Sequence, residues 1–203
     1  MSKLFRFNKD LVLVCSASFI RSLAVSCASV LLGIYLAERG LKLTEIGIVI
    51  TAGLFGSGLA TLLAGLWGER LGRKNFLILT SMFMAAGGIA MAFAQNFPVI
   101  LIASFAGFVN GQGRDRGPQN AMDQAIIPDI GTDSERTKSF VWYQIILDVG
   151  TSLGALAGAL PYIVRKWTGI SAMESYQWTF AAYGLLMASN IFSGPGNAAS
   201  KPL

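Results

Sequence analysis

The sequence predicts an all-α integral membrane protein with six transmembrane helices. Of its 203 residues, 53% are hydrophobic and only 13% are charged, whereas soluble domains carry about 25% charged residues. The mean hydropathy of +0.55 points the same way. A single soluble core cannot bury so much apolar surface, and a bilayer is the natural solvent for it. Each helical span needs about 20 apolar residues, so the chain has room for six.

Six apolar segments can be marked as spans, with short polar or charged connections between most of them. The fourth and the sixth are short for a full crossing, and the fourth is expected to extend into the polar stretch that follows it. The segments are Leu11–Ala37, Thr44–Trp67, Phe76–Ala94, Pro98–Gly113, Phe140–Val164 and Trp178–Ser193. Around this bundle, residues 11–193, we expect a cytoplasmic tail over 1–10, a cytoplasmic loop over 114–138 and a polar tail over 194–203.

Lysine and arginine are distributed unequally between the two sides of the predicted bundle. With the N-terminus inside, eleven of them fall on the cytoplasmic side and four on the opposite side. Cytoplasmic loops of membrane proteins carry such an excess, so both termini are predicted to be cytoplasmic. The net charge of +5 is therefore a topology signal, and no nucleic-acid partner is expected. The expected location is the cell membrane, in multiple passes, with a bacterial inner membrane as the specific prediction.

Several classes of chemistry find no support in the sequence. There is no histidine, which removes histidine-based catalysis and histidine metal sites. The two cysteines, Cys15 and Cys27, lie in one apolar segment without metal-ligand spacing, and we interpret them as small packing residues. Nothing matches the phosphate-binding P-loop pattern. The sequence therefore predicts no enzymatic activity, no metal and no cofactor.

The connection after the second span has a distinctive sequence, Gly65-Leu66-Trp67-Gly68-Glu69-Arg70-Leu71-Gly72-Arg73-Lys74. This loop, residues 65–74, resembles the signature loop G-x-x-x-D-R-x-G-R-R of the major facilitator superfamily, with Glu for Asp and Lys for the last Arg. It also falls where that family has it, between spans two and three on the cytoplasmic face. The resemblance implies a conformational latch, made in one state and broken in the other, formed by Gly65, Glu69, Arg70, Gly72, Arg73 and Lys74.

The residues of this loop also have direct physical interpretations. Gly65 is expected to permit close packing at the end of the second span, and Gly72 to permit the tight reversal of a short loop. The cations Arg70, Arg73 and Lys74 hold the loop in the cytoplasm. A purely topogenic basic loop is therefore the alternative to a latch.

The fifth span carries Gly150, Gly154 and Gly158 at four-residue spacing. Small residues at this spacing let helix backbones approach closely in lipid, so we expect a helix-packing surface. The pattern also resembles the antiporter motif G-x-x-x-G-P-x-x-G-G of the same superfamily, with alanine at the proline and at the last glycine. Proton antiporters of the family often carry an arginine in span four, and Gly107 stands at that position here.

Two ionisable residues lie deep inside predicted spans, Arg21 in the first and Asp148 in the fifth. At about 1.5 Å per residue, both sit about 15 Å from the cytoplasmic edge, near the middle of a core about 30 Å thick. A lone charge there costs about 2.5–3.5 kcal/mol on insertion scales, so we expect these opposite charges to pair. A pair across the substrate pathway would serve ion or substrate coupling, and a structural ion pair between two helices is the alternative.

The resemblance implies the N-terminal half of a major-facilitator-type twelve-helix fold, because typical members join two six-span halves. The chain is then a truncated product, one part of a split transporter, or a half that pairs with itself. The implied function is transport of a small solute across the membrane by a secondary-active, alternating-access mechanism. The expected partners are the lipid bilayer, an unknown small-molecule substrate and a second six-span half or a second copy. The alternative is a non-transporting truncated fragment or a membrane scaffold protein.

Overall fold

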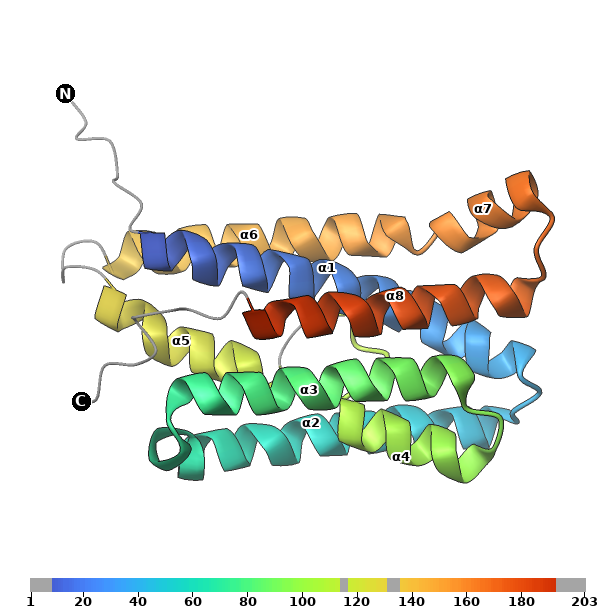
Figure 1. Cartoon of the computed structure of the whole chain (residues 1–203), viewed down its shortest axis with the longest axis horizontal. Helices are drawn as coiled ribbons and strands as arrows, with labels where there is room; N and C mark the ends of the chain where they lie inside the picture. The colour runs from blue at the N-terminus through green and yellow to red at the C-terminus, as the bar shows by residue number, and fades with distance from the viewer. Residues whose placement is uncertain (1–8, 114–116, 131–135, 193–203) are drawn as a thin grey trace.

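The computed structural model describes residues 9–113, 117–130 and 136–192, and this part of the chain folds into eight helices. The long helices run along the longest axis of the molecule and are joined at its two ends (Figure 1). In chain order they are α1 (Lys9–Glu38), α2 (Leu43–Leu71), α3 (Arg73–Phe93), α4 (Phe97–Gly107), α5 (Pro118–Ile130), α6 (Arg136–Ala157), α7 (Leu160–Thr168) and α8 (Ala172–Phe192). Nearly all of the predicted tails, 1–10 and 194–203, lies outside the described residues.

Four helical stretches within the described residues are long and apolar enough to cross a membrane. α1, α2 and α3 supply three of them, and α6 together with α7 supplies the fourth. α4 is apolar but shorter. The prediction of an all-helical membrane fold is therefore confirmed, although α4 and α8 do not meet the criteria for a span on their own.

The predicted fourth span is interrupted. Instead of one helix over Pro98–Gly113, α4 ends at Gly107, and Phe108 takes a left-handed backbone conformation with φ of 57°. The residues after Phe108 include an asparagine and two glycines, which disfavour a helix. α5 then begins at Pro118, and proline is well suited to the first turn of a helix. In Figure 1, α4 and α5 occupy opposite halves of the length of the molecule.

The segment 114–138, predicted to be a cytoplasmic loop, contains α5. Met122, Ile126 and Ile127 on this helix are buried against apolar residues of α1, α3 and α6. α5 is therefore part of the packed bundle, and the loop prediction is corrected. α5 packs in the bundle because its apolar residues recur at helical spacing and form one face. The polar residues between them make the segment look like a loop in the sequence.

A second interruption divides the predicted fifth span, Phe140–Val164. α6 ends at Ala157 and α7 begins at Leu160, with Pro161 in its first turn. In a continuous helix the proline ring would clash with the carbonyl group four residues earlier. That carbonyl group belongs to Ala157, the last residue of α6. The proline therefore fixes the position of the break.

α1 and α6 pack backbone against backbone. A methyl group added at Gly154 would lie 2.2 Å from the carbonyl oxygen of Leu23, and one at Gly150 would lie 2.3 Å from Ser22 Oγ. A methyl group at Gly158 would also meet an α1 side chain, at 3.1 Å. The three glycines therefore form the helix-packing surface that their spacing predicts.

The C-terminal end of α1 is hydrogen-bonded to the C-terminal end of α3. The Tyr35 hydroxyl donates to the carbonyl oxygen of Met91 at 2.6 Å. The Arg39 guanidinium donates to the carbonyl oxygens of Ala92, at 3.1 Å, and of Ala94. Carbonyl groups at the end of a helix lack partners within it, and the helix dipole favours a cation there. The Arg39 guanidinium therefore supplies hydrogen bonds to carbonyl groups at the C-terminal end of α3.

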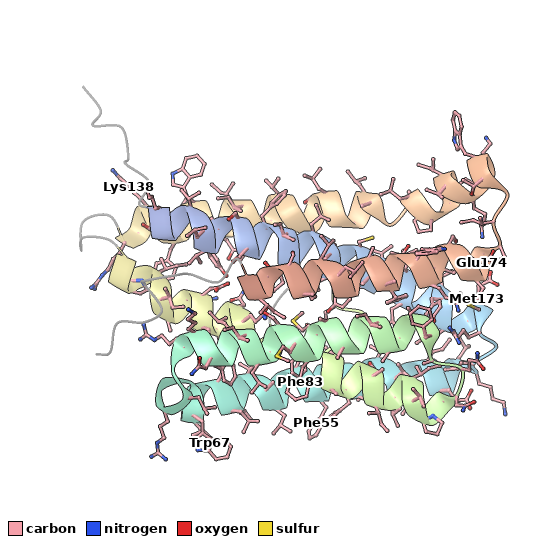
Figure 2. All side chains as sticks on the ribbon, in the orientation of Figure 1. Phe55, Trp67, Phe83, Lys138, Met173 and Glu174 are labelled. Atoms are coloured by element: carbon pink, nitrogen blue, oxygen red, sulfur yellow. The ribbon has the colours of Figure 1, made fainter. Side chains whose placement is uncertain are left out.

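Large apolar side chains cover the outside of the bundle. Figure 2 shows Phe55 and Trp67 projecting outward from α2, and 66% and 49% of their surfaces are exposed. In the same view Lys138 and Glu174 lie at opposite ends of the molecule. An apolar surface between charged ends is the arrangement expected of a helical bundle in a bilayer.

The packing of α1 on α6 predicts the effect of adding one methyl group. Gly154→Ala should destabilise the bundle by about 1–3 kcal/mol, because the helices have to separate. Gly33→Ala is the matched control, since a methyl group there meets no atom within 4 Å among the described residues. Thermal unfolding of both variants in mild detergent measures the difference. A Gly154→Ala variant as stable as Gly33→Ala would show that the two backbones are not in contact.

Candidate functional site

Donors from two helices converge on the carboxylate of Asp123 in α5. Arg21 Nη2 lies 2.5 Å from Asp123 Oδ2, and the two side chains are only 3% and 5% exposed. The hydroxyl groups of Ser18 and Tyr143 donate to the same oxygen at 2.8 and 3.1 Å. Ser18 and Arg21 belong to α1 and Tyr143 to α6, so the network joins three helices. A buried charge is tolerated where such pairing and hydrogen bonding accompany it.

The sequence predicts that Arg21 pairs with Asp148, but the carboxylate that Arg21 contacts is that of Asp123. Asp148 is exposed on α6 and accepts a hydrogen bond from Gln144 Nε2 at 3.1 Å. The side of α6 that meets α1 carries Gly150, and residues two apart on a helix do not share a face. Equal depth in the membrane therefore does not identify the ion-pair partner of Arg21.

The backbone of residues 108–113, which follows α4 and is not helical, is held by side chains of neighbouring helices. Ser29 of α1 donates to the carbonyl oxygen of Asn110 at 2.8 Å. Ser104 Oγ lies 2.6 Å from the carbonyl oxygen of Val109 and 2.9 Å from that of Val49 on α2. Irregular backbone at membrane depth persists only where it is buried in protein or lines a cavity. These hydroxyl groups replace part of the hydrogen bonding of a continuous helix.

The signature loop, residues 65–74, forms the end of α2, a tight turn and the start of α3. Gly72 has a φ of 80°, the conformation expected for a tight reversal, and α3 begins at the next residue. Arg70 and Lys74 are exposed, and Arg73 is half-buried. The side chain of Glu69 lies outside the described part of the structure.

The close packing predicted for Gly65 is made by another glycine. Among the described residues, no atom lies within 4 Å of a methyl group added at Gly65. A methyl group at Gly68 would lie 2.5 Å from Met122 Cε of α5. The contact at this end of α2 therefore belongs to Gly68, because α5 packs on that side of the helix.

Asp123 and Tyr143 are absent from the sequence-based set of site residues. Asp123 lies in the stretch 114–138 that the sequence places in the cytoplasm, where a carboxylate needs no buried partner. A signal for its burial is nevertheless present in the sequence. Pro118 marks a helix start, and Met122 and Ile126 follow at helical spacing.

The fold and these contacts define a multi-pass helical membrane protein. The chain matches the family model of the Major Facilitator Superfamily over residues 14–194, which is nearly its whole length. The chain therefore belongs to the Major Facilitator Superfamily.

Several curated proteins are similar to this chain over only part of their own length. The uncharacterized membrane protein YJR124C of Saccharomyces cerevisiae is 21% identical over 87% of this chain and 40% of its own. The quinolone resistance protein NorA of Staphylococcus aureus is 21% identical over 72% of this chain and 37% of its own. The H(+)/hexose cotransporter 1 of Parachlorella kessleri is 29% identical over 59% and 21%, respectively. The chain thus spans less than half the length of these relatives.

The ion pair predicts which charge reversal restores the fold. Arg21→Asp alone should destabilise the bundle by about 3–5 kcal/mol, because it leaves a buried charge without its partner. Adding Asp123→Arg should recover part of that loss, whereas adding Asp148→Arg should recover none. Thermal unfolding and the monodisperse yield in mild detergent measure the recovery. Rescue by Asp148→Arg instead of Asp123→Arg would contradict the pairing described here.

Proposed function

We propose that the chain is one six-crossing bundle of a secondary-active transporter that moves a small solute by alternating access. Six crossings result if α4 with α5 and α6 with α7 each count as one, beside α1, α2, α3 and α8. The excess of Lys and Arg supports a cell-membrane orientation with both ends of the bundle in the cytoplasm. The proposal requires a second bundle, supplied by a second copy of the chain or by another six-span unit.

A polar strip on α6 is the observation that carries this proposal. Gln144, Asp148 and Ser152 lie at four-residue spacing, and all three are exposed. Nearby exposed residues of the same helix, such as Val149 and Leu153, are apolar. Lipid chains offer no hydrogen bonds to a carboxylate or an amide, and polar residues inside spans mark ion and substrate pathways. We therefore assign the strip to a water-filled path at the boundary with a second bundle.

Asp148 and Arg21 have different roles in this proposal. Asp148 lies on the polar strip, where its carboxylate can contact the coupling ion or the substrate. Arg21 is buried and paired with Asp123, so it holds α5 against α1. Coupling therefore acts through Asp148, and the ion pair keeps the interrupted fourth crossing in register with the rest of the bundle.

α2 offers a second surface on which another bundle can pack. Among the described residues, no atom lies within 4 Å of methyl groups added at Gly47, Gly58 or Gly65. Glycine inside a helix costs about 0.5–1 kcal/mol relative to alanine. In membranes, the close approach of another helix offsets that cost. The open side of α2 therefore supports a contact with a second bundle, across which the two bundles rock.

The signature loop is proposed to be the latch between the two bundles. Its cations Arg70, Arg73 and Lys74 gather where α2 ends and α3 begins. Ion pairs from this position to a second bundle can form in one state and break in the other. A purely topogenic loop, in contrast, would tolerate any rearrangement of its positive charges.

The names of two relatives refer to chemically different compounds. One is named for quinolone resistance and another for the cotransport of protons and hexoses. Both names refer to small organic molecules, and one of them names their transport. For this chain we therefore propose a small organic solute, with ion coupling through Asp148.

Cysteine labelling distinguishes a water-filled path from a lipid-facing strip. In a Cys15→Ala, Cys27→Ala background, Ser152→Cys should react with a membrane-impermeant maleimide in intact membranes. Leu153→Cys, the adjacent residue on the same helix, should react at least tenfold more slowly, because it faces lipid. Both side chains are exposed on the bundle by itself. A difference between their labelling rates would therefore report whether water or lipid surrounds each position. Equal rates, or no reaction at Ser152→Cys, would contradict a pathway along α6 and favour a non-transporting scaffold.

The two-bundle arrangement predicts the mass of the purified protein. In mild detergent, the protein mass should be about twice 21.6 kDa, or that of a one-to-one complex with a second six-span chain. Light scattering with refractive-index detection measures it. Gly58→Leu, on the open side of α2, should weaken the assembly, whereas Gly33→Leu on α1 should leave it intact. A stable wild-type monomer would refute the arrangement.

A further inference from the structure

A groove of about 320 Å³ lies between α1, the break from α6 to α7, and α8. α1 contributes Leu23 and Cys27 to its lining, the break contributes Ala157 and Pro161, and α8 contributes Ala182. In Figure 1, α7 is inclined away from α8 beyond the break. The proline that separates α6 from α7 therefore also shapes this groove.

The groove is apolar and opens on the outside of the bundle. Nearly all of the surface that its described residues present is apolar. Val164 of α7 and Trp178 and Leu186 of α8 line it and are exposed. Such a surface is stabilised by contact with apolar groups. On the outside of a bundle in a bilayer, the chains of lipids are the apolar groups at hand.

The groove extends over the depth of one leaflet. Its α8 residues run from Ser175 to Leu186, a rise of about 16 Å along the helix, which is half of a hydrocarbon core about 30 Å thick. Trp178 at its outer part is 71% exposed, and Trp167 at the end of α7 is 85% exposed. Tryptophan is enriched at the membrane–water interface. The groove therefore runs from the interface to the middle of the core, like the acyl chains of one leaflet.

A cation lies on α7 at the outer end of the groove. Pro161 and Val164 line the groove, and Arg165, four residues after Pro161, shares their face of the helix. The Arg165 guanidinium carbon lies 5.5 Å from the centroid of the Tyr162 ring. Among the described residues, no carboxylate forms an ion pair with Arg165. A guanidinium stacked on a ring still presents N–H donors at its edge, so Arg165 can bind an anion there.

We propose that this groove binds an anionic phospholipid, with one acyl chain between α1, α7 and α8 and the phosphate group at Arg165. The planar guanidinium can donate two parallel hydrogen bonds to phosphate oxygens. A zwitterionic lipid has the same chains and a phosphate, but its headgroup also brings a cation close to that of Arg165. The bound lipid fills the space between α7 and α8 and fixes the short α7 at the membrane surface.

This inference is independent of the proposed transport. A bundle that does not transport would hold the lipid equally well, and a transporting bundle could leave the groove to lipids of any charge. Labelling of Ser152→Cys and lipid binding at the groove therefore succeed or fail separately.

Quenching of Trp178 fluorescence by brominated lipids tests the proposal. Trp67→Phe, Trp142→Phe and Trp167→Phe leave Trp178 as the one tryptophan of the full chain. This protein is reconstituted in phosphatidylcholine vesicles that contain the same mole fraction of either brominated phosphatidylglycerol or brominated phosphatidylcholine. The apparent affinity at Trp178 should be at least threefold higher for brominated phosphatidylglycerol.

Variants on α7 separate a site from general attraction of anionic lipids to the protein. Arg165→Gln should make the two affinities equal, whereas Arg165→Lys should retain part of the preference. Lys166→Gln is the matched control. Lys166 lies two residues after Val164 and therefore on another face of the helix, so this variant should leave the preference unchanged.

Variants on α8 test the place of the acyl chain. Ala182→Phe puts a ring into the groove at an exposed position and should abolish the preference. Leu185→Phe should leave it unchanged, because Leu185 is exposed but is not a lining residue. Equal affinities in the parent protein, or an undiminished preference in Arg165→Gln or Ala182→Phe, would overturn the proposal. Weak quenching by both lipids would overturn it as well, since protein would then fill the groove.

Discussion

The backbone of this protein has to satisfy its hydrogen bonds without help from water, and the rest of the structure depends on that constraint. Regular helices meet it within themselves. Where the backbone leaves the helix after α4, hydroxyl groups from Ser29 and Ser104 provide the partners. Where α3 ends, the Arg39 guanidinium does so. Polar side chains therefore supply hydrogen bonds at these points, where regular backbone hydrogen bonding stops.

The same constraint applies to the buried charges. One carboxylate oxygen of Asp123 accepts hydrogen bonds from Arg21, Ser18 and Tyr143. Burying any of these polar groups without a partner would cost free energy. Their arrangement has a geometric effect, because the donors come from α1 and α6. No continuous helix joins α5 to α4, which ends at Gly107, so the position of α5 depends on this network and on its apolar contacts. Buried ion pairs often add little net stability, and this one instead specifies where α5 lies.

The sequence predicted those parts of the fold that depend on neighbouring residues along the chain, such as the apolar helices. Apolar segments, the basic bias and the spacing of Gly150 and Gly154 gave the membrane class and a correct helix contact. The partner of Arg21 depends on which helix lies beside α1, and α5 was concealed within a polar stretch. The left-handed Phe108 has no residue signature, since glycine or asparagine usually occupies that conformation. Pro161, in contrast, does signal an interruption, and its position in an apolar segment would have located the break between α6 and α7.

The separation of the ion pair along the chain has a consequence for biosynthesis. Arg21 and Asp123 are 102 positions apart, and translation adds about 5–20 residues per second. About 5–20 s therefore pass between the synthesis of the cation and that of its partner. During this time the arginine avoids the centre of the bilayer by reaching toward the headgroups. α1 can therefore complete this buried ion pair only after α5 has been synthesised.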